Sequence, residues 1–265
     1  MREAAEGTFE TVLSVAGPAT LDVAVDYGLI RVRAGDPGSV RIRGILRARR
    51  WFFGWVSVEN RIRQLESKPP VEQSGTTIQV GAVAGRWLFR GIALYLEITV
   101  PADTRIRALA DSGDIRVEGI AGAVDCETDS GDVELSAIHG NVRASADSGS
   151  IRIREVAGRV NAEADSGDIE ALEIAGEIEA ATDSGDIRIS QTVAAPVRAE
   201  ADSGGIRVQL APGAGYNVSA ETDHGRITVP EMEWRTRSKQ EVDGRIGGGG
   251  PLVDLETDSG DIDIA

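Results

Sequence analysis

The motif Asp-Ser-Gly recurs along this chain at a fixed interval, and that interval restricts the fold more than any other feature. Regular copies stand eighteen residues apart at Asp111, Asp129, Asp147, Asp165 and Asp183. Further copies lie at Asp202 and Asp258, with Asp-His-Gly at Asp223 and a degenerate copy at 21–32. Identical residues at one spacing stack when successive turns of the chain form a parallel coil, with strands about 4.8 Å apart. The repeat therefore predicts a β-solenoid.

The repeat 124–141 indicates how one coil closes. Its residues Val124, Cys126 and Thr128 alternate with acidic side chains, which is the period of a strand with one buried face. Asp129-Ser130-Gly131 then supplies a turn, because Asp bonds to the backbone ahead of it and Gly tolerates positive φ. A second strand follows with large apolar residues. Small inward residues facing Ile and Val predict a thin, flattened coil.

Outward positions of successive repeats carry opposite charges. One such column runs through Arg116, Glu134, Arg152, Glu170 and Arg188. Opposite charges on adjacent strands attract, so this alternation is expected if the coils lie side by side. We therefore predict an all-β chain that forms a single parallel β-solenoid with coils of about eighteen residues. We expect a right-handed coil because parallel crossovers are overwhelmingly right-handed, and the six-residue apolar spacing of the left-handed hexapeptide helix is absent.

The regularity of the repeat divides the chain into two parts. Residues 1–105 are predicted to form N-terminal coils with a capping insertion that includes a short helix at 59–66. Residues 106–265 are predicted to form the regular Asp-Ser-Gly-Asp solenoid, with an insertion at 230–252. The last coil, 253–265, is expected to pack on the C-terminal end.

A basic and aromatic cluster at 41–55 has two interpretations. It contains Arg41, Arg43, Arg47, Arg49 and Arg50, followed by Trp51-Phe52-Phe53-Gly54-Trp55. Such clusters bind membrane interfaces or sugars. Alternatively, the aromatic side chains cover the open end of the solenoid, which needs a cap to prevent edge pairing.

Charge excludes one class of partner. The formal net charge is −15, whereas nucleic-acid binding needs clustered Lys and Arg. Residues 1–105 carry 14 basic and 11 acidic side chains, and residues 106–265 carry 14 and 32, so the acidity belongs to the regular repeat.

No stretch reaches the roughly 20 apolar residues of a transmembrane helix. The single cysteine, Cys126, replaces an inward Ala and is predicted to be a buried thiol.

Paired aspartates in the turns predict a metal site. The pairs, named here the Asp ladder, are Asp111, Asp114, Asp129, Asp132, Asp165, Asp168, Asp183, Asp186, Asp258 and Asp261. Stacked carboxylates repel one another, and Ca²⁺, which takes six to eight oxygen ligands, would relieve that repulsion. In the alternative interpretation, the first Asp of each pair accepts bonds from turn N–H groups and the second is solvated. No other cofactor is predicted.

Catalysis is disfavoured because the acidic residues recur uniformly. Polysaccharide-active β-helix enzymes interrupt their repeat at one place, where unlike residues converge. The histidines, His139 and His224, fall in different columns several coils apart. The repeated Ser belongs to a turn. No catalytic residue is predicted.

Several segments outside the turns carry a resemblance to a known family. They are Phe9–Val32, the helix with Pro69-Pro70-Val71-Glu72-Gln73, Val100-Pro101-Ala102-Asp103-Thr104, and the Gly-Gly-Gly-Pro-Leu-Val stretch before the last coil. Together with the repeats, they resemble a bacterial β-strand-repeat family of unknown function whose members are labelled as candidate adhesins. The resemblance covers nearly the whole chain. Family members commonly have Gly-Ser-Gly where this chain has Asp-Ser-Gly.

The resemblance implies an exported or envelope-anchored protein without established catalytic residues. We therefore expect a non-catalytic surface or envelope module, an adhesin or scaffold, with a surface glycan or a protein as its ligand. This interpretation implies an export signal that has been removed. The alternative is a cytoplasmic rod that associates through its ends, like bactofilins, and a polysaccharide-active enzyme is the least favoured.

Overall fold

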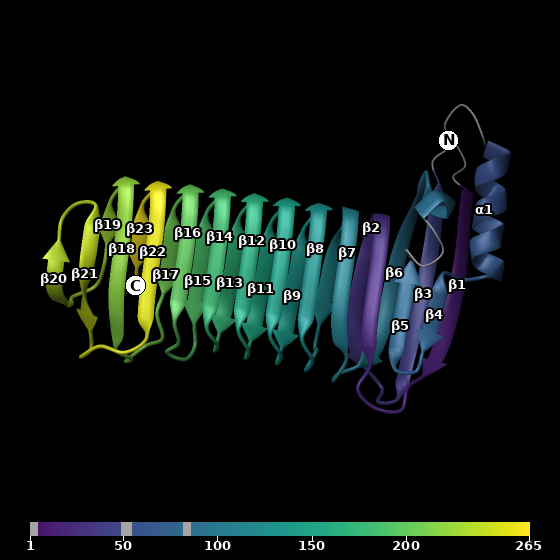
Figure 1. Cartoon of the computed structure of the whole chain (residues 1–265), viewed down its shortest axis with the longest axis horizontal. Coiled ribbons are helices and arrows are strands. Elements are labelled where there is room, and N and C mark those ends of the chain that lie inside the picture. Colours follow the sequence, from purple (N-terminus) through teal and green to yellow (C-terminus); the bar gives the residue numbers. More distant parts are fainter. Residues whose placement is uncertain (1–4, 49–54, 82–85) are drawn as a thin grey trace. The chain divides into compact units, whose positions relative to one another are not determined.

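The computed structural model describes residues 5–48, 55–81 and 86–265. After the two gaps, side chains are described from residue 58 and from residue 88 onward. The chain divides into two compact units, an N-terminal unit of residues 1–131 and a C-terminal unit of residues 132–265. Figure 1 labels the helices and strands of both units. The boundary at residue 105 was drawn from repeat regularity and stays a prediction.

Paired strands form the coils of the C-terminal unit. In chain order they are β9 (Val133–Ile138), β10 (Val142–Ser148), β11 (Ile151–Val156), β12 (Val160–Ser166), β13 (Ile169–Ile174), β14 (Ile178–Ser184), β15 (Ile187–Gln191), β16 (Val197–Ser203) and β17 (Ile206–Gln209). Even-numbered strands pair in parallel with each other, and so do odd-numbered strands. Val142 lies opposite Val160, and Ile151 opposite Ile169, so the register equals the repeat. The parallel β-solenoid is confirmed, and its handedness stays a prediction.

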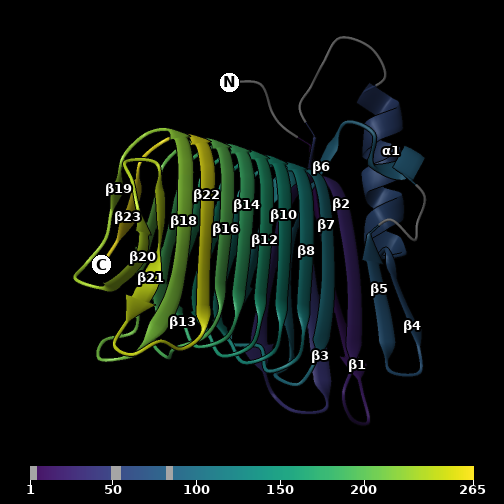
Figure 2. The same cartoon turned by 60° about the vertical axis from the view of Figure 1, so that its left-hand side comes forward.

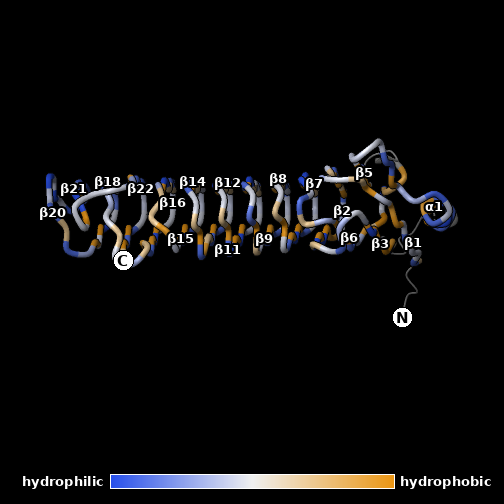
Figure 3. Tube along the Cα trace, turned by 90° about the horizontal axis from the view of Figure 1, so that it is seen from below, coloured by the Kyte–Doolittle hydropathy of each residue, from blue (hydrophilic) through white to orange (hydrophobic). Residues whose placement is uncertain are grey.

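The interior of each coil is filled from two unequal sides. Ala144, Ala162 and Ala180 face inward from the even-numbered strands, and Ile151 and Ile187 from the odd-numbered ones; all are at most 3% exposed. Figure 3 shows the stronger hydrophobic colour on the side of β11 and β15. Each fully buried Ile contributes roughly 1.5–3 kcal/mol to stability. The predicted thin coil is therefore confirmed.

Glycines in the Asp-Ser-Gly turns allow the coils to approach one another. Gly149, Gly167 and Gly185 have φ of +153° to +157°, a conformation that other residues rarely adopt. A Cβ on Gly167 would lie 2.0 Å from the carbonyl oxygen of Gly149 in the preceding coil. The buried hydroxyl of Thr182 donates to the Gly167 carbonyl at 3.2 Å. Backbone packing at this corner thus requires glycine.

The opposite corner holds non-glycine residues in the left-handed region. Ala137, Glu155 and Glu173 have φ of +54°, +57° and +59°, and Gly119 occupies the same repeat position in the N-terminal unit. An L-residue there carries a cost of about 1–2 kcal/mol. This strained corner was not predicted from the sequence, although Gly119, a glycine at the same repeat position, was a signal for it.

A Glu173→Gly substitution is expected to raise the free energy of unfolding by about 0.5–1 kcal/mol, because glycine removes the backbone strain. Chemical denaturation followed by circular dichroism measures the change. Glu163→Gly makes the same change of charge at an exposed strand position and should instead lower stability by about 1 kcal/mol. A loss of stability in both variants would contradict the proposed strain.

The last coil in the sequence is not the last coil in space. The remaining strands are β18 (Tyr216–His224), β19 (Ile227–Thr228), β20 (Glu233–Arg237), β21 (Glu241–Ile246), β22 (Leu252–Ser259) and β23 (Ile262–Ile264). Strand β22 pairs in parallel with both β16 and β18, so Val253 lies between Val197 and Val218 (Figure 2). Strand β23 likewise lies between β17 and β19.

The predicted position of the 253–265 coil on the C-terminal end is therefore wrong. The outer edge of β18 is occupied by the antiparallel strand β21, which in turn pairs with β20. This β20–β21 hairpin is the predicted insertion 230–252. Because it covers the outer side of β18, the following segment pairs on the inner side, next to β16.

The N-terminal unit has a coil architecture of its own, with less regular strands. Its elements are β1 (Ala5–Ser14), β2 (Thr20–Gly35), β3 (Ser39–Ala48), α1 (Trp55–Ser67), β4 (Val71–Ser74), β5 (Thr77–Gly81), η2 (Arg86–Phe89), β6 (Ile92–Pro101), β7 (Arg105–Glu118) and β8 (Val124–Ser130). Strand β2 pairs in parallel with β7, with Leu21 opposite Ile106 and Val32 opposite Val117. The degenerate copy at 21–32 thus forms a coil. Strands β5 and β6 pair with its other edge.

Antiparallel strands and a helix cover the end of this unit. Strand β3 pairs antiparallel with β6, β1 with β3, and β4 with β5. Helix α1 is longer than the predicted 59–66 and buries Ile62 and Leu65. The Glu66 carboxylate accepts a hydrogen bond from the Thr8 backbone N–H at 2.9 Å. Strand β3 connects β1 and β6 in this cap.

Candidate binding groove

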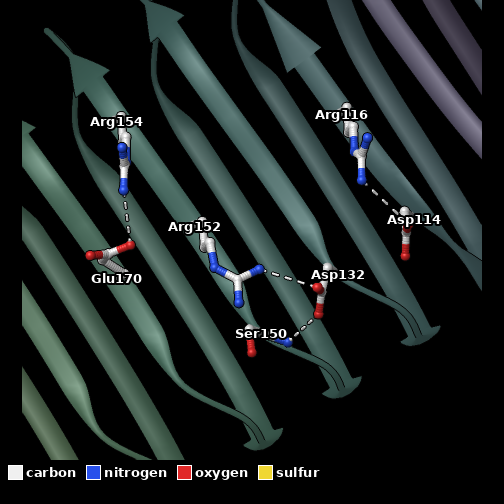
Figure 4. Close-up of polar contacts among 7 residues, drawn as sticks. All are labelled: Asp114, Arg116, Asp132, Ser150, Arg152, Arg154 and Glu170. Carbon is white, nitrogen blue, oxygen red and sulfur yellow. Dashed lines mark hydrogen bonds and ion pairs between the residues drawn. The ribbon is translucent and has the colours of Figure 1, made fainter.

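The outward charge column is in register within the C-terminal unit, but its contacts are partly diagonal. Glu134 lies opposite Arg152, and Arg152 opposite Glu170. Arg152 donates to Asp132 at 3.1 Å, and Arg154 forms an ion pair with Glu170 at 3.3 Å (Figure 4). In the N-terminal unit, Arg116 similarly contacts Asp114 at 3.7 Å.

The second Asp of the turn bonds to the backbone of the next coil. The Asp132 carboxylate accepts from the Ser150 N–H at 2.9 Å, and the Asp168 carboxylate from the Asp186 N–H at 2.9 Å. Asp186 accepts from Gly205 at 2.8 Å, and Asp261 from Arg226 at 2.9 Å. These N–H groups lie at the turn, between the regular strand ladders, so the side chain supplies their acceptor.

This pattern corrects the structural alternative proposed from the sequence. There, the first Asp of each pair was expected to bond to the turn and the second to be solvated. In the structure the second Asp makes the bond, whereas the first is exposed at Asp129, Asp165, Asp183 and Asp258. Asp111 and Asp114 are half-buried in the N-terminal unit. The Asp ladder thus contributes to coil stacking.

Metal binding by the Asp ladder stays a prediction. Within residues 5–48, 55–81 and 86–265, no group of three or more His, Cys, Asp or Glu side chains has an arrangement that could hold a metal ion. The exposed first aspartates repeat along the turns at Asp165 and Asp183. Ca²⁺ bound to them would need additional oxygen ligands, since it takes six to eight.

If the Asp ladder binds Ca²⁺, millimolar Ca²⁺ should raise the melting temperature more than NaCl of equal ionic strength. Binding to the native state alone adds about 2.7 kcal/mol at a hundredfold excess over Kd. Mg²⁺ should have a smaller effect because it prefers a tight octahedron. Replacing Asp165, Asp168, Asp183 and Asp186 with Asn should remove the difference between the salts. Equal shifts in Ca²⁺ and NaCl would contradict the prediction.

A polar groove of about 380 Å³ crosses the outer face of β13, β15, β17 and β23. Its lining includes Asp186, Arg188, Gly205, Arg207, Asp261 and Asp263. Gly205 stands where the regular motif has its second Asp, so one side chain is missing from the row. Asp186 lies opposite this gap through its bond to the Gly205 N–H.

The charge alternation also fails at this groove. Arg188 lies directly opposite Arg207. Arg207 forms an ion pair with Asp263 at 3.3 Å, and Glu170, the other neighbour of Arg188, is paired with Arg154. Arg188 is exposed and forms no hydrogen bond or ion pair with any residue that the structure describes. The groove therefore contains one uncommitted guanidinium.

A shallower depression on the other face of the C-terminal unit has about 240 Å³ and contains paired charges. Arg159 contacts Glu179 at 2.9 Å, and Arg198 pairs with Glu200. Arg143, which belongs to the same face, lies 3.6 Å from Glu163. Because these groups neutralise one another, this face offers less to a ligand than the groove around Arg188.

Two other candidate features have structural explanations. Burial raises the pKa of the Cys126 thiol above its usual range, with a smaller contribution from the Asp125 carboxylate, so the thiol stays protonated. In the basic cluster, Arg41 lies 3.8 Å from Glu10 and Arg47 lies 3.1 Å from Glu6. Arg49 to Gly54, and the side chain of Trp55, lie outside the described residues. The described arginines connect cap strands.

The geometry defines a class of protein, a parallel β-solenoid with a polar groove on its outer face. The family model described as Toastrack DUF4097 matches residues 56–265. This chain belongs to that family. No curated protein matches the sequence at a significant level. Within the parts of the chain that the structure describes, no helix is long and apolar enough to cross a membrane.

Two solved structures are similar to this chain. A putative adhesin from Bacteroides fragilis matches with a TM-score of 0.57 and 15% identity over 97% of both chains. A putative cell adhesion protein from Clostridium sporogenes matches with a TM-score of 0.37 and 14% identity, over 97% of this chain and 98% of that chain. The Bacteroides structure supports the fold.

Proposed function

We propose that this chain is a non-catalytic binding module of the bacterial surface or envelope, and that it acts as an adhesin. The observation that carries this proposal is the groove around Arg188 and Gly205, where a turn side chain is missing and two arginines lie opposite each other. Three carboxylates of its lining, Asp168, Asp186 and Asp261, accept backbone N–H bonds. A carboxylate held in this way orients a ligand, whereas a hydrolase or lyase needs an acid and a base with separated pKa values.

The ends of the units argue against end-to-end assembly of the bactofilin kind. Strand β20 pairs with β21 alone among the described strands, and all its residues are exposed, including Arg235 and Arg237. Charged side chains on an edge strand oppose pairing with another chain. In the N-terminal unit, helix α1 lies against the outermost strand β1 through Glu66 and Thr8. We therefore favour a module that binds through its side.

Adhesion can be tested with fluorescent beads coated with the purified chain and washed over a glycan array. We expect retention on a subset of glycans, with no new reducing ends or unsaturated sugars in the wash. Beads coated with the thermally unfolded chain serve as the control. Absence of retention, or release of cleaved sugar, would reject the proposal. Filaments in a sedimentation assay would favour the structural-rod alternative. Protease accessibility of the tagged chain on intact cells tests the surface location.

A further inference from the structure

The groove on β13, β15, β17 and β23 has the chemistry for one acidic group. Arg188 and Arg207 are opposite each other on parallel strands, about 4.8 Å apart. Like charges at this spacing repel, and an anion between them would remove the repulsion. A guanidinium presents planar paired donors that match a carboxylate bidentately. Since Asp263 already pairs with Arg207, Arg188 is the group that a ligand carboxylate would reach.

The carboxylates of Asp186 and Asp261 in the groove are hydrogen-bond acceptors, so they would bind donor groups of a ligand. Asp186 and Asp261 each use Oδ1 to accept a backbone N–H. Their Oδ2 atoms accept no hydrogen bond from any residue in the described part of the chain. These carboxylates would repel a polyanion, but they would bind hydroxyl groups. The ligand that fits therefore carries one acidic group among several hydroxyls.

The backbone of the groove favours a saccharide over a peptide. Extended peptides commonly bind by adding a strand to a free sheet edge. Here β15 pairs with β13 and β17, and β23 pairs with β17 and β19, so these strands have partners on both edges. The volume of about 380 Å³ lies within the range of small-molecule sites. The absence of a side chain at Gly205 leaves room for a ring close to the backbone.

We propose that this groove binds an acidic saccharide, with a uronic-acid carboxylate on Arg188 and sugar hydroxyls on Asp186 and Asp261. The proposal rests on the binding function proposed above and names the substrate class of that site. Two variants separate the contribution of the Arg188 charge from that of the open space at Gly205. Arg188→Gln removes the free charge at an exposed position. Gly205→Asp restores the repeat motif and fills the gap, where a Cβ has its nearest contact 3.3 Å away and no positive φ is required.

Calorimetric titration with glucuronosyl-xylotriose, a saccharide with a single carboxylate, tests the proposal, and its methyl ester is the neutral ligand of matched shape. We expect the unmodified chain to bind this acidic saccharide, and to bind the ester about tenfold or more weakly, because a charge-assisted pair is lost. Arg188→Gln should weaken binding of the acid by a similar factor, and Gly205→Asp should abolish it. Arg143→Gln, on the opposite face, should bind as the unmodified chain does. Melting curves establish that each variant is folded.

The proposal is overturned if glucuronosyl-xylotriose does not bind, if the ester binds equally well, or if both groove variants retain full affinity. Binding of an end-blocked peptide with one glutamate in place of the saccharide would assign the groove to an acidic peptide and would also overturn it. The bead assay distinguishes this failure from failure of the proposed function. Retained beads without binding of glucuronosyl-xylotriose would leave the adhesin proposal standing and reject only the ligand class.

Discussion

A Gly167→Ala variant is expected to lose at least about 3 kcal/mol of the free energy of unfolding, or to fail to fold. The added Cβ would lie 2.0 Å from the Gly149 carbonyl oxygen and 2.7 Å from its carbon. Both atoms are backbone and belong to a coil that is held in place by parallel strand pairing on its neighbours. Relief of the overlap would require the two coils to separate at this corner. The φ of +157° adds strain of its own.

The control for this prediction is Gly213→Ala. Gly213 also has a positive φ, +74°, but a Cβ there would meet no atom within 4 Å. This variant should lose only about 1 kcal/mol, which is the cost of the left-handed conformation. Urea unfolding monitored by circular dichroism compares the two. Similar losses would indicate that strain in the single residue, and not contact between coils, makes Gly167 necessary.

An Ala162→Leu substitution is expected to cost roughly 3 kcal/mol by overpacking the interior. Ala162 is fully buried and lies between Ala144 and Ala180 on the adjacent parallel strands. The thin coil has little space beyond these small side chains, because interiors are close-packed. A leucine would therefore push the two sheets of the C-terminal unit apart. Thermal unfolding of the purified variant measures the cost.

Glu163→Leu is the matched control because it adds the same side chain on the other face of the same strand. Glu163 is exposed and its ion pair with Arg143, at 3.6 Å, is worth at most about 1 kcal/mol. This variant should keep most of its stability and lose solubility. Equal destabilisation by the two substitutions would show that the inward and outward faces of β12 are assigned incorrectly.

Most of the fold could be predicted because the repeat spacing indicates which residues lie next to each other on adjacent strands. A fixed spacing implies parallel stacking, and the alternation of Ala162 with Glu163 identifies the buried face. The strained corner at Glu173 could not be predicted in this way, since glutamate gives no signal of a positive φ. The hydrogen bond that the Asp168 carboxylate accepts from the next coil was also not predicted, because a turn aspartate has several equivalent acceptor geometries.

The groove was beyond sequence reasoning for a different reason. The Gly205 departure from the motif and the adjacent Arg188 and Arg207 are visible in the sequence. Their surroundings depend on Asp261 and Asp263, which belong to a coil that the sequence order places one coil too far along, beyond β18 and β19. A repeat predicts which residues are equivalent. It does not predict the order in which the coils stack when an insertion intervenes.

The position of the 252–264 coil has a kinetic consequence. During synthesis from the N-terminus, β18 is available before β22. Strand β18 can therefore first pair with β16, at the position that β22 occupies in the final structure. The final order then requires β16 and β18 to separate so that β22 can insert between them. Such rearrangement joins residues distant in sequence and is slow compared with local pairing. The C-terminal unit is therefore expected to mature in two phases, with growth coil by coil followed by a separate intercalation step.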